Sequence, residues 1–175
     1  MSADPFDWET CFARRAPRIL DVGCGEGHFL IAAAQANPDH DHLGIDLLRP
    51  LIDRATLRAT GLPNVRFVCA DAAAWLKRET ALDEIHIYHP QPYFHPEQAP
   101  LGLLTPAFFE DCRRALRPGG RLVLQTDNKS YGRYLLEAAR RCFAMETLPG
   151  PWPDAPKGRT RRETLARRKG LLILR

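Results

Sequence analysis

Short apolar segments alternate along this chain with segments of helical periodicity, and connections between them are short. Such alternation produces a mostly parallel sheet with helices on both faces. We therefore predict an α/β Rossmann-like fold in a single domain, residues 1–175, because this length suits one core. The predicted strands are 18–22, 42–46, 65–69, 84–89 and 121–126. The predicted helices are 26–37, 50–60, 72–78, 106–116 and 129–141. Weaker strand signals at 144–148 and 171–174 bring the predicted sheet to seven strands.

The first apolar segment runs into a glycine cluster, Asp21-Val-Gly-Cys-Gly-Glu-Gly27. A dinucleotide-binding loop has the spacing G-x-G-x-x-G, which needs glycine where this chain has His28. A pyrophosphate site also avoids carboxylates, because the helix N-terminus that follows attracts anions. S-adenosylmethionine has no phosphate and carries an ammonium and a sulfonium, which suit the Asp21 carboxylate, while Gly23, Gly25 and Gly27 let the backbone approach a ligand closely. The cluster therefore predicts an S-adenosylmethionine site.

Two further acidic residues follow the next predicted strands. Asp46 ends the second strand and suits the two ribose hydroxyls of the cofactor. Asp71 follows the third strand and suits the adenine amino group, with the backbone N–H of Ala72 as a donor beside it. Taken alone, either acid is better explained as a helix N-cap. Together with Asp21, at neighbouring strand ends, they favour one cofactor site.

Composition excludes several classes of protein. The five cysteines are scattered without a C-x-x-C pair and the six histidines lack metal-ligand spacing, so we predict reduced thiols and no metal. No apolar run approaches the ~20 residues of a membrane span, and the first residues lack the pattern of a signal peptide. We therefore predict a cytoplasmic protein without a membrane partner.

Positive charge gathers at the end of the chain. Residues 151–175 carry a net charge of +6 in a chain whose total is +4, which leaves −2 for the rest. A basic edge on a mildly acidic body suits contact with a polyanion. A solvated basic face would give the same pattern.

Four segments carry a resemblance to a known family: Leu43-Gly-Ile-Asp46 with Arg49-Pro50, His89-Pro-Gln-Pro-Tyr93, Thr126-Asp127 and Thr160-Arg-Arg-Glu163. In order and approximate spacing they resemble the bacterial tRNA (guanine-N7)-methyltransferases, over residues 18–175. The resemblance implies methyl transfer from S-adenosylmethionine, tRNA as the partner, and a class I methyltransferase fold. It also implies substrate contacts from Asp127, Thr160, Arg161 and Glu163. The family's N-terminal extension is reduced here to about 17 residues before the first strand.

The segment after the fourth strand departs from the family's usual P-D-P-W. Pro90 and Pro92 match it, whereas Gln91 and Tyr93 replace the aspartate and the tryptophan. The family's basic run after this motif is also missing, since residues 94–104 contain no lysine or arginine. Because each basic side chain on a phosphate adds to binding through counterion release, this loss lowers the expected affinity for nucleic acid.

The expected chemistry tolerates these changes. Guanine N7 carries a lone pair and no proton, so methyl transfer requires alignment and exclusion of water but no general base. We predict that Gln91 orients the base edge and that Asp127 accepts hydrogen bonds from it, as the two catalytic residues. His89 and Tyr93 are predicted to stack on the flat substrate, a contact that any base can make.

Three functions from different classes are compatible with the sequence. The first is methylation of guanine N7 in tRNA. The second is methylation of a small aromatic or heterocyclic molecule, with the loop at 90–104 as a lid, which the missing basic run favours. The third is a non-catalytic relative that binds RNA or cofactor, which the three strand-end acids argue against. Nothing in the sequence chooses between a monomer and a homodimer.

Overall fold

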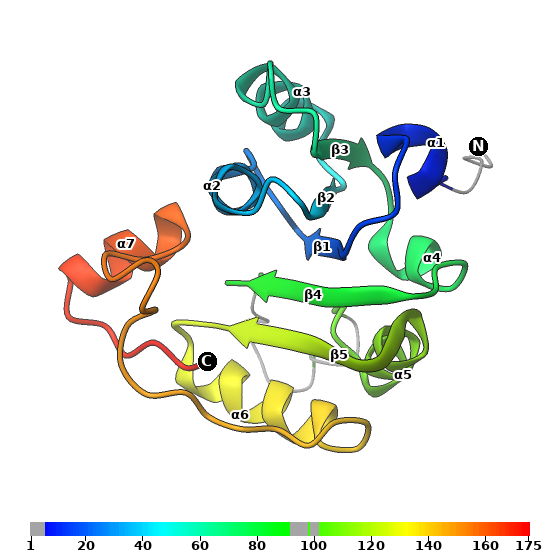
Figure 1. Cartoon of the computed structure of the whole chain (residues 1–175). Coiled ribbons are helices and arrows are strands. Elements are labelled where there is room, and N and C mark those ends of the chain that lie inside the picture. Colours follow the sequence, from blue (N-terminus) through cyan, green and yellow to red (C-terminus); the bar gives the residue numbers. More distant parts are fainter. Residues whose placement is uncertain (1–5, 92–97, 99–101) are drawn as a thin grey trace.

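A five-stranded parallel sheet forms the centre of the computed structural model, which describes residues 6–91, 98 and 102–175. The strand order is β3-β2-β1-β4-β5, so the chain starts in the middle, winds to one edge, then crosses to the other (Figure 1). This reversal between β1 and β4 creates a switch point where ligands of such sheets bind. The strands are β1 (Arg18–Val22), β2 (Asp41–Asp46), β3 (Val65–Cys69), β4 (Leu82–Tyr88) and β5 (Leu116–Gln125).

Helices cover both faces of the sheet. Alternate residues of β1 point to opposite faces. Leu20 and Val22 belong to the apolar cluster under α4 (Ala72–Leu76), α5 (Pro106–Ala115) and α6 (Lys129–Ala139), whereas Ile19 belongs to the cluster under α2 (His28–Ala36). In Figure 1, α2 and α3 lie on one side of the sheet and α5 and α6 on the other. The helices are α1 (Trp8–Phe12), α2 (His28–Ala36), α3 (Arg49–Arg58), α4 (Ala72–Leu76), α5 (Pro106–Ala115), α6 (Lys129–Ala139) and α7 (Arg161–Arg168).

The predicted α/β architecture is confirmed, but the predicted seven strands are wrong. Within the described residues the sheet has five strands, and 144–148 and 171–174 add none to it. Leu174 makes only an isolated antiparallel bridge to Thr126, with reciprocal N–H···O bonds of 2.9 Å. A ladder cannot extend from 144–148 because prolines follow it at positions 149 and 151, and proline has no N–H to donate.

Local signals position the other elements well. β1 and β3 have their predicted bounds, and Thr105 caps α5 by accepting a hydrogen bond from Phe108 N at 3.2 Å, with Pro106 in the first turn. Residues 117–120, between the predicted helix and the predicted strand 121–126, belong to β5, and the register of β5 against β4 shifts there. Over residues 6–91, 98 and 102–175, no helix is long and apolar enough to cross a bilayer.

Candidate functional site

The glycine cluster forms an open backbone surface at the carboxyl ends of β1 and β2, called here the glycine ledge (Gly23–Gly27). Gly23, Gly25 and Gly27 all have positive φ, at 75°, 55° and 75°, which favours glycine. A Cβ on Gly23 or Gly25 would meet nothing within 4 Å, so the ledge faces free space. A Cβ on Gly27 would lie 2.6 Å from the ring of Phe67, so this glycine is needed for packing against β3. The first two glycines can thus approach a ligand, and the third supports the loop.

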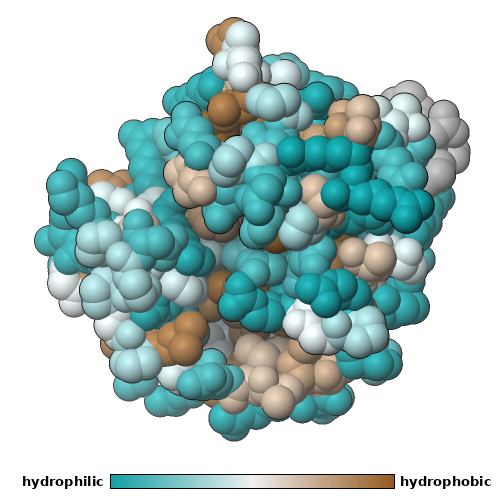
Figure 2. All heavy atoms as spheres, in the orientation of Figure 1, coloured by the Kyte–Doolittle hydropathy of each residue, from teal (hydrophilic) through white to brown (hydrophobic). Residues whose placement is uncertain are grey.

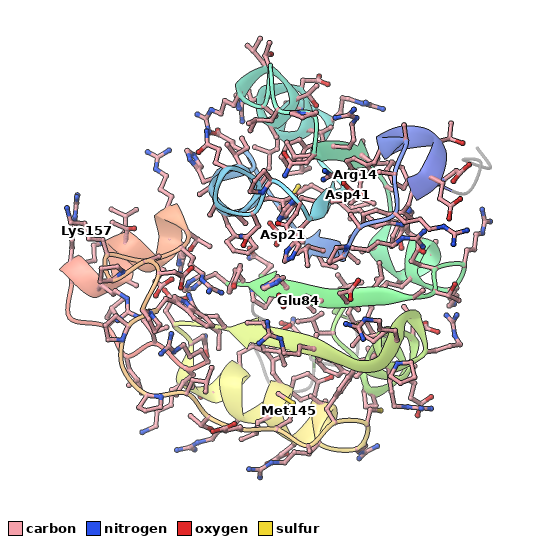
Figure 3. The ribbon with its side chains drawn as sticks, viewed as in Figure 1. Arg14, Asp21, Asp41, Glu84, Met145 and Lys157 are labelled. Carbon is pink, nitrogen blue, oxygen red and sulfur yellow. The ribbon has the colours of Figure 1, made fainter. Side chains whose placement is uncertain are left out.

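Asp21 lies beneath this ledge and is almost completely buried, with 3% of its surface exposed. Figure 3 shows it in the interior of the molecule. Burial, with a smaller contribution from the nearby carboxylate of Asp46, raises the pKa of Asp21 to about 8. A buried acid held in its neutral form is stabilised as an anion when a cation docks beside it. Asp21 is therefore suited to an ammonium group.

Asp46 ties the ledge to the end of β2. Its two carboxylate oxygens accept from Gly25 N at 3.0 Å and from Leu48 N at 2.9 Å. A carboxylate has about four acceptor positions, so both oxygens retain capacity for ligand hydroxyls.

The third predicted acid, Asp71, caps α4. It is exposed and accepts from Ala74 N at 2.8 Å, while Ala72 is buried. Asp71 follows β3, which pairs with β2, so the three acids occupy the ends of three adjacent strands.

A cavity of about 610 Å³ joins the start of the glycine cluster to the predicted substrate segment. Gly23 and Asp46 line one part of it, and His89, Pro90 and Gln91 line another. Gln91 is exposed, and Tyr93 lies outside the described residues. The fit to S-adenosylmethionine rests on this donor set: a buried acid for the ammonium, a carboxylate with free acceptor positions, and an unobstructed glycine ledge.

Asp127, the predicted base-reading acid, has partners for both carboxylate oxygens. His89 Nδ1 lies 3.2 Å from one oxygen, and Arg162 Nε donates to the other at 2.9 Å. Burial raises the pKa of Asp127, but the hydrogen bonds from Arg162 and His89 outweigh it and hold the pKa below its ordinary value. Asp127 is therefore an ionised, oriented acceptor. The predicted stacking role of His89 concerns the faces of its ring and stays a prediction.

The predicted residues Thr160 and Glu163 build the start of α7. Thr160 Oγ1 accepts from Glu163 N at 3.0 Å, and the fully buried Glu163 carboxylate accepts from Arg159 N at 2.9 Å and Arg167 Nε at 2.8 Å. Arg161 is exposed on the same turn. Arg162, which the sequence placed only in the basic edge, is the member of this turn that reaches Asp127.

A buried polar chain anchors the segment before α7 to β4, and sequence reasoning did not find it. Arg159 donates to the Tyr88 hydroxyl at 3.0 Å, and that hydroxyl lies 3.0 Å from His86 Nδ1. His86 Nε2 in turn lies 2.8 Å from Glu84, which is labelled on β4 in Figure 3. The period-2 pattern of β4 signals buried strand positions but does not say that polar residues fill them.

The surface beyond this anchor is basic. Figure 1 shows α7 beside the carboxyl ends of β4 and β5, and Figure 2 shows a mainly hydrophilic surface over it. Its exposed basic residues are Lys157, Arg161, Arg162, Arg168 and Lys169. In the part of the chain that the structure describes, no group of three or more His, Cys, Asp or Glu side chains is arranged to hold a metal ion.

Comparisons with known proteins agree on one family. The sequence profile of a family described as "Putative methyltransferase" matches residues 15–173. A tRNA (guanine-N(7)-)-methyltransferase from Halorhodospira halophila is 32% identical over 170 residues, which cover 94% of this chain and 74% of that protein. A protein of the same name from Alkalilimnicola ehrlichii is 33% identical over 175 residues, which cover 97% of this chain and 73% of that protein.

Solved structures agree on the fold. The crystal structure of the 16S rRNA methyltransferase KamB matches with a TM-score of 0.73 at 18% identity, covering 95% of this chain and 90% of that chain. The antibiotic-resistance methyltransferase Kmr matches with a TM-score of 0.62 at 23% identity, covering 99% and 94%. These likenesses show the Rossmann-like methyltransferase fold.

Proposed function

This chain belongs to the family of tRNA (guanine-N7)-methyltransferases, and we propose that it transfers a methyl group from S-adenosylmethionine to N7 of a guanine in tRNA. The observation that carries the proposal is the cavity that runs from Gly23 and Asp46 to His89 and Gln91. Gly23 and His89 line the same cavity, and the His89 ring contacts the ionised Asp127, which supports the proposal. One cavity thus serves a cationic methyl donor and a base that needs an acceptor at its edge.

Cofactor binding is assigned to the strand-end acids. Asp21 holds the ammonium, Asp46 holds the ribose hydroxyls, and Asp71 with Ala72 holds the adenine edge. S-adenosylmethionine, held by these residues, would supply an electrophilic methyl group for the lone pair of guanine N7. The nucleophile carries no proton, so the chain needs to align the two reactants and exclude water.

Substrate binding is assigned to the end of β5 and to α7. Asp127 accepts from the N1–H and amino group of guanine, which adenine cannot donate in the same pattern. Gln91 offers a hydrogen bond to the base edge but, being neutral, does not offset positive charge on the methylated purine. Thr160 and Glu163 hold the first turn of α7, and Arg161 on that turn faces RNA phosphate.

Methyl-labelled S-adenosylmethionine and bulk tRNA provide the direct test. Incubation followed by nucleoside analysis should place the label in 7-methylguanosine. Label in another nucleoside would contradict the proposed base, and an unlabelled tRNA pool with methylation of a small aromatic compound would establish the alternative function.

Replacing Asp46 by Ala should weaken cofactor binding by about 1–3 kcal/mol, because charge-assisted hydrogen bonds to the ribose are lost. Calorimetry with S-adenosylhomocysteine measures this change. Asp39→Ala is the matched control, since Asp39 is an exposed acid just before β2, at the opposite end of that strand. Unchanged affinity in a folded Asp46→Ala protein would remove Asp46 from the site.

Replacing Arg161 and Arg162 together by Ala should flatten the salt dependence of tRNA binding by roughly two units of slope, because each phosphate contact contributes about one. Cofactor affinity should barely change. Arg140→Ala with Arg141→Ala removes the same charge from exposed positions beyond the end of α6, and should leave the slope unchanged. Equal slopes for both double variants would place the RNA interface elsewhere.

A further inference from the structure

We propose that His89 is a positioning residue for Asp127, held as the neutral imidazole with its proton on Nδ1 by a hydrogen-bond chain that runs from Trp152 through Gln125. The inference rests on the proposed function in one respect, which is that Asp127 is the acceptor that reads guanine. The chain itself is a feature of the folded protein and is testable without substrate.

The chain begins at Trp152, whose indole nitrogen can only donate. Trp152 is buried, and its Nε1–H donates to Gln125 Oε1 at 2.7 Å. The guanidinium groups of Arg159 and Arg175 lie 3.8 and 4.1 Å from its ring centroid and hold the ring by cation–π contact. Because the indole cannot accept, the Gln125 amide must present its oxygen to Trp152.

The orientation of Gln125 then decides where the proton on His89 sits. Gln125 is 1% exposed, and its Nε2 lies 3.0 Å from His89 Nε2. The Gln125 side chain also lowers the pKa of the Glu163 carboxylate, as an amide NH₂ directed towards it would, which agrees with the orientation that Trp152 requires. An amide NH₂ has no lone pair to offer, so His89 Nε2 must accept. A proton on that nitrogen would face another donor inside the protein.

His89 therefore carries its proton on Nδ1, where Asp127 accepts it at 3.2 Å. Burial lowers the pKa of His89, and although Asp127 and Glu163 oppose this, the net shift is downward, with Arg162 contributing to it. The ring is neutral at neutral pH, so Asp127 receives a hydrogen bond without being neutralised by an adjacent imidazolium. The second carboxylate oxygen of Asp127 accepts a hydrogen bond from the exposed side chain of Arg162.

The backbone of His89 supports a dedicated role. Its N–H donates to Gln125 C=O at 2.7 Å, which extends the pairing of β4 with β5 by one residue, and its φ is then +49°. This left-handed conformation is unfavourable for most side chains and is best tolerated by Asn, Asp and His after glycine. It turns the chain away from the sheet and leaves the imidazole between the two strand ends. The glutamine, the histidine and the carboxylate thus form one rigid unit.

Nitrogen-15 NMR of the imidazole tests the tautomer in the protein alone. His89 should show a protonated Nδ1 and an unprotonated Nε2 at neutral pH. Gln125→Glu should raise the His89 pKa and protonate Nε2, because the introduced carboxylate accepts where the amide donated. A proton on Nε2 of the unaltered protein, or an imidazolium at neutral pH, would overturn the proposal even if the enzyme methylates tRNA as proposed.

Kinetics test the positioning role. His89→Asn suits the backbone and keeps an N–H donor near the place of Nδ1, so its kcat should fall less than about tenfold, whereas His89→Leu should lose about 10²-fold in kcat. KM for tRNA should change little in either, because phosphates dominate affinity. Thermal melting separates unfolding from misalignment, and the NMR result decides the proposal if His89→Leu does not fold. Wild-type kcat in His89→Leu, or equal losses in both variants, would contradict it.

Discussion

Replacing Asp21 by Asn is expected to stabilise the protein while abolishing cofactor binding. Burial raises the pKa of Asp21 from 3.8 to about 8, so between these values the folded protein holds a proton that the unfolded chain has released. Folding stability contributed by this proton is full below pH 4 and is lost as the pH rises through about 8. An amide has no charge to desolvate, so the variant avoids this loss. At about 1.4 kcal/mol per pH unit, a rise in pKa from 3.8 to about 8 makes the gain in unfolding free energy at pH 8.5 at most about 6 kcal/mol.

Denaturant unfolding of both proteins at pH 4 and pH 8.5 measures this effect, and calorimetry with S-adenosylmethionine measures the loss of binding. Calorimetry in buffers of different ionisation enthalpy should also detect a proton released by the wild-type protein on binding at pH 7, and none by Asp21→Asn. Asp41→Asn is the matched control, because Asp41 is equally buried but pairs with Arg14 at 2.7 Å (Figure 3). Breaking that pair should destabilise the protein.

The Asp→Asn substitution is thus expected to raise the free energy of unfolding at Asp21 and to lower it at Asp41, although the two acids lie in neighbouring strands. A stability loss in Asp21→Asn at pH 8.5 would show that the Asp21 anion already has a partner in the free protein. Retained cofactor affinity would remove Asp21 from the ammonium site.

Sequence reasoning selected the acids and glycines at the ends of β1 and β2 because their signals are local. Asp21 and Asp46 each end a buried strand, and the glycines that follow β1 show their spacing directly in the sequence. In a parallel sheet, adjacent strands bring such ends together whatever the details of the helices. The predicted start of α5 at residue 106 is local in the same way, since Thr105 caps the helix and Pro106 stands in its first turn.

The substrate half depends on contacts between distant positions. Asp127 meets His89 across 38 positions and Arg162 across 35, and no periodicity connects them. Their contact depends on the crossing from β4 to β5 and on the return of the C-terminal segment to the sheet. Sequence reasoning therefore selected Asp127 and His89 separately, and it placed Arg162 in the basic edge without its ion pair to Asp127.

The sequence at the start of α7 carries a local capping signal, which the family resemblance interprets as a substrate contact. Thr160 and Glu163 have the spacing of a capping box, in which a threonine caps the helix and the acid three residues later bonds back towards it. In the structure Thr160 accepts from Glu163 N, and the Glu163 carboxylate accepts from the N–H of the preceding Arg159. The family resemblance suggested a substrate contact for the same pair. A capping role explains why Glu163 is buried and leaves its contact with substrate a prediction.

Replacing Asp127 by Ala is expected to abolish methylation, with a loss of about 10²-fold or more, while leaving most tRNA binding intact. The carboxylate orients one base, and misplacing that base by about 1 Å is enough for such a loss. Phosphate contacts carry most of the affinity and do not involve this acid. Removing Asp127 also releases Arg162, which is 65% exposed and becomes free to meet phosphate. Affinity for tRNA at low salt should therefore stay the same or rise.

Single-turnover methylation and tRNA binding, measured on the same preparations, separate these two effects. Glu146→Ala is the matched control, because it removes one negative charge from an exposed acid of the C-terminal segment that lies outside the hydrogen-bond chain to His89. It should raise low-salt tRNA binding slightly and leave methylation intact, and that result would show that net charge alone does not account for the Asp127 result.

Asp127→Asn adds a finer distinction, since it keeps an acceptor for His89 but cannot neutralise Arg162. Parallel loss of binding and methylation in Asp127→Ala would mean that Asp127 supports the RNA interface as a whole. Methylation at the wild-type rate would exclude Asp127 from base recognition and return guanine selection to Gln91.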